Sequence, residues 1–130
     1  MTEKELSTEE RIFHSACEVF LLFGYHGTKI RKITELSGAN NAALNYYFRS
    51  KEKLYEKVVG FLLDTVPETD NNKHLNNIDN EKLKWFLFTE LYNNQELFEK
   101  TIRNLNPDKW DNQMEKIKIL VGIKYAPNRK

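Results

Sequence analysis

The sequence has little cysteine, and it contains no long apolar run. Cys17 is the only cysteine in the 130 residues, so an internal disulfide is excluded. Its position in an apolar helical stripe predicts a buried, inert thiol. No segment approaches the roughly 20 apolar residues that a transmembrane helix needs. The N-terminal residues 1–6 are acidic and polar, unlike a secretory signal, and we therefore expect a cytoplasmic protein.

Residues that would mark an enzyme are also scarce. Five glycines leave little material for a loop that cradles a nucleotide phosphate. His14, His26 and His74 are scattered, without the spacing of metal ligands. No Ser/His/Asp set and no paired carboxylate motif stands out. We therefore expect neither an enzyme nor a cofactor.

The net charge of +1 conceals an uneven distribution along the chain. Residues 1–25 carry two basic and five acidic side chains, whereas residues 26–57 carry seven basic and three acidic ones. The charges of residues 65–130 nearly balance. A compact basic block is the footprint of a protein that binds a polyanion, although a merely solvated surface gives the same pattern.

Helical periodicity dominates the chain, and no segment alternates like a β-strand, so we expect an all-α protein. Gly24 and Gly38 are natural stops for the first two helices. Ser7 has Glu10 three residues later, as in a capping box. Four residues stand at expected helix N-caps: Ser7, Thr28, Asn40 and Ser50. The expected inward positions of the four helices are Ile12, Phe13, Ala16, Cys17, Val19, Phe20, Leu21 and Phe23; Ile30, Ile33 and Leu36; Ala43, Leu44 and Tyr47; and Leu54, Tyr55, Val58, Val59 and Leu62.

A break in the helical pattern divides the chain. Pro67 ends the fourth helix, and the asparagine-rich segment that follows has no periodicity. We therefore expect a first domain at residues 1–63, a connector at 64–80 and a short helical region at 81–130. In that last region the pattern predicts three helices, with Asn94 as the N-cap of the second. Their expected inward positions are Leu83, Phe86, Leu87 and Leu91; Leu97, Phe98, Ile102 and Leu105; and Trp110, Met114, Ile117 and Val121.

Two short helices joined by a glycine-containing turn, between Thr28 and Tyr47, have the spacing of a helix-turn-helix. The second of them is too short to be stable alone, and Ala43, Leu44 and Phe48 can brace it. Its other face presents amides for adenine edges, a methyl group for thymine and a phenol, which suits a DNA major groove. The outward residues are Asn41, Ala42, Asn45 and Tyr46. A solvated surface is the alternative, and for Asn40 we expect capping as the main role.

Groups suited to phosphate flank this face. Thr28 and Lys29 precede one helix, and Lys51 begins another, where free N–H groups favour anions. Arg31 can reach sideways to a base, preferentially guanine, or simply face solvent.

These residues carry a resemblance. The segments Gly24-Tyr-His-Gly-Thr-Lys-Ile-Arg-Lys-Ile33, Leu36-Ser-Gly-Ala39 and Leu44-Asn-Tyr-Tyr-Phe-Arg-Ser-Lys-Glu-Lys-Leu-Tyr55 resemble the N-terminal domain of the tetracycline-repressor (TetR) family. The likeness covers about residues 8–63. It implies that residues 40–47 form the recognition helix, with Thr28, Tyr46, Tyr47 and Lys51 at phosphates and Arg31, Asn41, Ala42 and Asn45 at bases. Asn45 departs from the tyrosine frequent there in the family, which leaves the base preference open.

The resemblance also implies a homodimer on a palindromic operator, acting as a repressor that a small effector can release. Only 67 residues follow Leu63, fewer than the family's C-terminal domain usually has, so its ligand pocket is in doubt. Trp85, Phe88 and Tyr92 could bind a small apolar effector, although aromatics at this spacing more often fill a core. For the dimer contact we expect the final helix, with Ile119 and Leu120, together with part of the Glu81–Tyr92 helix. The alternative function is a protein-interaction module of the same fold that no longer binds an operator.

Overall fold

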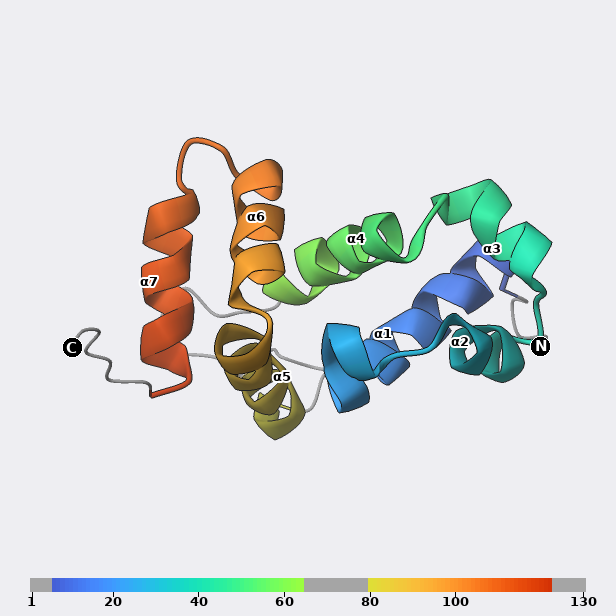
Figure 1. Ribbon diagram of the computed structural model, residues 1–130, viewed down its shortest axis with the longest axis horizontal. Coiled ribbons are helices and arrows are strands. Elements are labelled where there is room, and N and C mark those ends of the chain that lie inside the picture. Colours follow the sequence, from blue (N-terminus) through green and yellow to red (C-terminus); the bar gives the residue numbers. More distant parts are fainter. Residues whose placement is uncertain (1–5, 65–79, 123–130) are drawn as a thin grey trace, which may run out of the picture. The chain divides into compact units, whose positions relative to one another are not determined.

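The computed structural model describes residues 6–64 and 80–122, and these form seven α-helices and no β-strand (Figure 1). The helices are α1 (Thr8–Gly27), α2 (Ile30–Ser37), α3 (Asn41–Phe48), α4 (Lys51–Leu63), α5 (Asn80–Asn93), α6 (Gln95–Leu105) and α7 (Trp110–Leu120). This confirms the all-α class. In the described ranges no helix is long and apolar enough to cross a membrane. Most of the predicted connector, residues 65–79, lies outside the described residues.

Two compact units, Met1–Val58 and Val59–Lys130, divide the chain within α4. The sequence pattern predicts the end of the first domain at residue 63, where α4 itself ends, and this boundary stays a prediction.

The first unit is built around one face of α1. Its buried side chains come from all four helices, which explains how the eight-residue helices α2 and α3 are stabilised by tertiary contacts. Three predicted inward residues of this unit, Phe23, Leu36 and Tyr47, are instead exposed, and so is Leu105 of α6 in the second unit. On α2 the inward positions are taken by Ile33, Thr34 and Ser37, so Leu36 points away from α1. The buried core of this unit is Ile12, Ala16, Cys17, Val19, Phe20, Ile33, Leu44, Phe48, Leu54, Tyr55 and Val58.

Three of the four predicted N-caps are confirmed. Ser7 forms a full capping box with Glu10, the two bonds measuring 2.9 and 3.1 Å. The side-chain oxygen of Asn40 accepts a bond from the N–H of Ala43 at 2.8 Å, and Ser50 Oγ accepts one from Lys53 at 3.1 Å. These caps satisfy helical N–H groups that have no partner within the helix.

Thr28 was predicted to cap α2, and this is wrong by one residue. Lys29 is the N-cap of α2, while Thr28 ends α1. The reason lies at Gly24, whose positive φ of 74° interrupts α1 as predicted but is followed by another helical turn. The hydroxyl of Thr28 donates to the carbonyl of Gly24 at 2.7 Å and lies 3.4 Å from that of Val19. Thr28 therefore closes the break in α1.

The second unit contains the end of α4 and helices α5, α6 and α7, of which α6 and α7 lie side by side (Figure 1). Asn94 is the N-cap of α6, as predicted, but its side chain makes no cap bond. Its amide instead donates to the buried carboxylate of Glu90 at 2.9 Å. Met114 and Ile117 of α7 are buried, and the other buried apolar side chains are Val59, Leu62, Leu63, Leu83, Phe86, Leu87, Leu91, Phe98 and Ile102.

Candidate nucleic-acid interface

Helices α2 and α3 form a helix-turn-helix whose corner is fixed by hydrogen bonds. Gly38 takes the left-handed conformation, with φ 78° and ψ 9°, and its N–H donates to the carbonyl of Thr34 at 2.9 Å. The Ser37 hydroxyl donates to the same carbonyl at 3.2 Å and accepts from the N–H of Ala39, also at 3.2 Å. Glycine is favoured at this corner because a positive φ costs it almost nothing.

The buried face of α3 is held by apolar contacts, as its sequence predicts. Leu44 and Phe48 are buried, and the rings of Phe48 and Phe13 stack with their centroids 6.5 Å apart. Arg11 of α1 donates from Nε to the carbonyl of Ser37 at 3.0 Å, which ties α1 to the end of α2. The orientation of α3 is therefore set by the fold.

The opposite face of α3 is exposed along its whole length. Asn41 and Asn45 lie one turn apart, so both amides share this face with the methyl group of Ala42. Tyr46 is 74% exposed, and its ring contacts that of Tyr47 edge to face at 5.0 Å. All the predicted outward residues of α3 are thus gathered on one surface. The Asn40 side chain stands at the start of this helix and is engaged in its cap.

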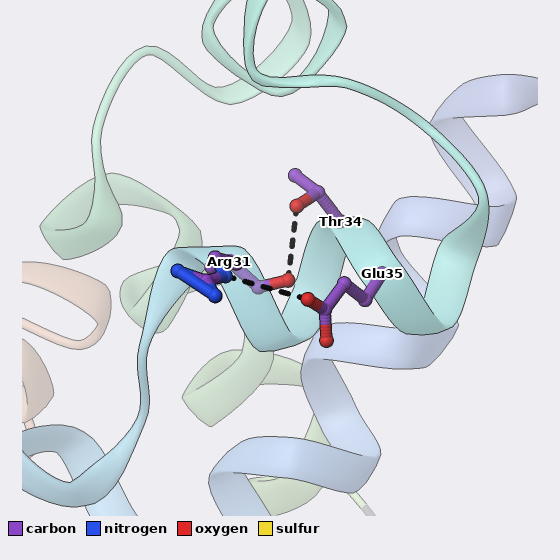
Figure 2. A network of polar contacts seen from close by, with 3 residues as sticks. All are labelled: Arg31, Thr34 and Glu35. Carbon is purple, nitrogen blue, oxygen red and sulfur yellow. Dashed lines mark hydrogen bonds and ion pairs between the residues drawn. The ribbon is translucent and has the colours of Figure 1, made fainter.

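Arg31 lies on the exposed side of α2, one turn before Glu35 (Figure 2). Its Nε lies 3.4 Å from the Glu35 carboxylate, and both side chains are largely exposed. An exposed i,i+4 ion pair contributes little to stability. A phosphate or a base edge can therefore compete for the guanidinium at small cost.

Cationic side chains flank this surface at two helix starts. Lys29 is exposed and, having no acceptor atom, leaves the first turn of α2 without a side-chain cap. Lys51, the first residue of α4, lies with its Nζ 4.2 Å from the centre of the Tyr25 ring. Partial burial, together with the charge of Lys29, lowers the pKa of Lys51. The two ammonium groups thus interact, and a phosphate anion placed between them would relieve their repulsion.

Thr28 is placed differently from the other predicted phosphate contacts. Its side chain is only 2% exposed, and its single hydroxyl hydrogen is engaged with the carbonyl of Gly24. In this structure that hydroxyl is therefore not available to phosphate.

Two residues near this surface were missed by the pattern. Lys32, which belongs to the basic block, lines an open groove along α2 together with Lys29 and Arg31. Arg49, at the end of α3, has a positive φ of 76°. The charge block could have marked Lys32, whereas no sequence signal indicates a left-handed arginine.

Trp85, Phe88 and Tyr92 form a ladder of rings on α5 in the second unit. Successive ring centroids are 5.8 and 5.7 Å apart, and Trp85 and Tyr92 are 59% and 77% exposed. Of the aromatic residues on this helix, Phe86 is the one that fills the core. Trp85 and Tyr92 thus lie largely at the surface of the second unit, and an effector site at these rings stays a prediction.

Comparison with known proteins agrees with this geometry. The family model described as bacterial regulatory proteins, tetR family, matches residues 12–58, which span α1 to most of α4. The N-terminal domain of this chain belongs to the TetR family. It is the part of the chain that contains the helix-turn-helix, and the resemblance inferred from the sequence is confirmed.

Curated relatives share the TetR domain. The HTH-type transcriptional regulator RutR of Escherichia coli (strain K12) is 43% identical over 56 residues, which are 43% of this chain and 26% of RutR. The probable HTH-type transcriptional regulator YttP of Bacillus subtilis is 36% identical over 55 residues, 42% of this chain and 27% of YttP. The HTH-type transcriptional repressor NicS of Pseudomonas putida is 31% identical over 75 residues, 58% of this chain and 35% of NicS. The match thus spans about a quarter to a third of each relative, and no solved structure matches the chain.

Proposed function

We propose that this chain is a sequence-specific DNA-binding transcriptional regulator that inserts the exposed face of α3 into a major groove. The observation that carries the proposal is the placement of Asn41 and Asn45 together on that face, next to the cationic starts of α2 and α4. Amides in this arrangement can pair with adenine edges, while the cations bind the backbone on either side. The names of the curated relatives, all HTH-type regulators, support it.

The roles divide by chemistry. Lys29, Lys51 and the phenols of Tyr46 and Tyr47 would contact phosphates and so fix the position of the protein on the duplex, whatever its sequence. Arg31, Asn41, Ala42 and Asn45 would read base edges. Repression is the proposed direction of control, supported by the similarity to NicS, a transcriptional repressor.

We propose that the regulator works as a two-fold dimer on a palindromic operator. A single eight-residue recognition helix covers too few base pairs to select one site, and dimers read half-sites about one helical turn, ~34–36 Å, apart or a multiple of it. Met114 and Ile117 of α7 are buried within the second unit, so they are not available to a partner copy. Among the exposed apolar side chains of the second unit, we propose Ile119, 71% exposed, and the ring ladder of α5 for the contact with a partner copy.

Salt-dependent binding to duplex DNA tests the phosphate contacts. We expect Lys51→Ala to weaken binding to all duplexes alike and to lower the slope of log K against log salt by about one unit. Lys82→Ala, an exposed lysine of α5, is the matched control and should leave the slope unchanged. A folded parent protein with no salt-dependent affinity for duplex DNA would refute the proposal and favour the protein-interaction module.

Base reading is tested on a site selected from a randomised duplex library. Asn41→Ala or Asn45→Ala should each cost roughly 1–3 kcal/mol on the selected site and much less on random DNA. Asn104→Ala, an exposed asparagine of α6, is the control. Equal losses on both DNAs would show that these amides do not read bases.

Light scattering tests the dimer. We expect the parent to be a dimer at micromolar concentration and Ile119→Glu, combined with Trp85→Glu, to be monomeric and still helical. A parent that is monomeric at high micromolar concentration contradicts the dimer, and a double variant that remains dimeric contradicts this interface.

A further inference from the structure

Lys51 has an unusual neighbour for a lysine at a helix start. Its ammonium lies over the ring of Tyr25, with Nζ 4.2 Å from the ring centroid. Attraction between a cation and the face of an aromatic ring is effective within about 6 Å. Within the described residues no carboxylate forms an ion pair with this ammonium, and besides burial it is the like charge of Lys29 that lowers its pKa. The ring is therefore what holds Lys51 in place.

The ring of Tyr25 is itself fixed. Tyr25 follows the break in α1 at Gly24 and contacts Tyr55 edge to face, with the ring centroids 4.8 Å apart. It also lies nearly parallel to the ring of Phe20, at 6.3 Å and 5°. Both Tyr55 and Phe20 are fully buried in the core. A half-buried ring with two buried neighbours gives the lysine a rigid platform.

We propose that Tyr25 is the positioning residue for Lys51, its ring holding the ammonium at the start of α4, ready to bind a DNA phosphate. The inference rests on the proposed DNA-binding function. A free lysine side chain loses rotamer freedom when it binds, and this loss weakens affinity. Where the ring has already ordered the side chain in the folded protein, the rotamer entropy is lost on folding and not on binding. The hydroxyl of Tyr25 has no part in this role, since the face of the ring is what attracts the cation.

A double-mutant cycle measured by duplex binding tests the role. Tyr25→Leu removes the ring face and should weaken binding to all duplexes by about three- to tenfold, the size expected for ordering one long side chain. Tyr25→Phe keeps the face and should stay within about twofold of the parent. In a Lys51→Ala background, Tyr25→Leu should cost less than about twofold, because the cation it positions is gone.

The outcomes separate the two proposals. If Lys51→Ala weakens binding but Tyr25→Leu costs as much with Lys51 as without it, Tyr25 is a structural residue and the inference fails alone. If Tyr25→Phe loses as much duplex affinity as Tyr25→Leu, the role belongs to the hydroxyl, and the inference is also overturned. A parent that binds no duplex refutes the proposed function together with this inference.

Folding of each variant is checked by circular dichroism. If Tyr25→Leu does not fold, NMR of the parent decides, since a ring face shifts nearby protons upfield. We expect the ε-methylene protons of Lys51 to resonate clearly upfield of those of Lys53, an exposed lysine of the same helix, and to stay there in Tyr25→Phe. Equal shifts for the two lysines would overturn the proposal.

Discussion

Replacing Arg49 by glycine should stabilise the first unit, because the backbone at this position is strained. Arg49 has φ 76° and ψ −49°, and the N–H of Ser50 donates to the carbonyl of Phe48 across it at 2.9 Å. This is a γ-turn with positive φ, which is rare and strained for residues with a side chain. The turn is needed here because α3 must end and α4 must begin within two residues.

The size of the effect follows from two opposing contributions. A side-chain-bearing residue in such a conformation costs about 1–3 kcal/mol. Glycine relieves that strain. Its unfolded chain is more flexible than that of alanine, however, and this entropy reduces the gain in stability by about 0.5–1 kcal/mol. Arg49→Gly should therefore raise the free energy of unfolding by about 1 kcal/mol. In urea denaturation this is a midpoint increase of roughly 0.3–1 M.

Arg49→Ala is the matched control, because it removes the same charge but keeps a β-carbon. Its stability should stay within about 0.5 kcal/mol of the parent, as for other exposed substitutions. The assay is urea unfolding of all three proteins, followed by far-ultraviolet circular dichroism. If Arg49→Gly is no more stable than Arg49→Ala, the strain argument is refuted.

Three further predictions concern a surface pair, the thiol and a buried amide. Glu35→Gln should tighten duplex binding about two- to fivefold, since it frees Arg31 and removes a negative charge beside phosphate; unchanged affinity in a fluorescence anisotropy titration would place Arg31 outside the interface. Burial, and secondarily Glu18, raises the pKa of Cys17 to about 12. The native thiol should thus resist thiol reagents at pH 8. The stability that Cys17 contributes should be complete below pH 9 and fall as the pH rises towards 12, by up to about 1.4 kcal/mol per pH unit; the same slope in Cys17→Ala would contradict this. Asn94→Ala removes a donor to the buried Glu90 carboxylate and should destabilise the second unit by about 1–3 kcal/mol in urea unfolding, and a loss no greater than that in the exposed neighbour Asn93→Ala would refute it.

Local features were predictable from the sequence, and features that join distant segments were not. The caps at Ser7, Asn40 and Ser50 depend on a hydrogen bond to a residue three positions on, so their spacing shows in the sequence. The outward face of α3 followed from the helical period in the same way. The placement of Lys51 over Tyr25 joins residues 26 positions apart, and no local pattern carries it.

The two capping errors have a different, local origin. Thr28 has the chemistry of an N-cap, but the broken end of α1 offers its hydroxyl a carbonyl acceptor. Asn94 stands at the expected cap position, yet a buried carboxylate one turn earlier takes its amide. In both cases a partner four residues earlier in the chain prevailed over the capping preference that the sequence displays.

The hydrogen-bonded corner between α2 and α3 bears on how quickly a duplex can be searched. Ser37 forms hydrogen bonds with both Thr34 and Ala39, and Gly38 ends α2. The exposed face of α3 is therefore already ordered in the protein without DNA. Contact with DNA then resembles the docking of a rigid body, and its heat-capacity change should reflect buried surface without a coupled folding contribution. An encounter with a wrong sequence has no folding step to reverse. On the proposed function, the protein would leave such a site as fast as its phosphate contacts break.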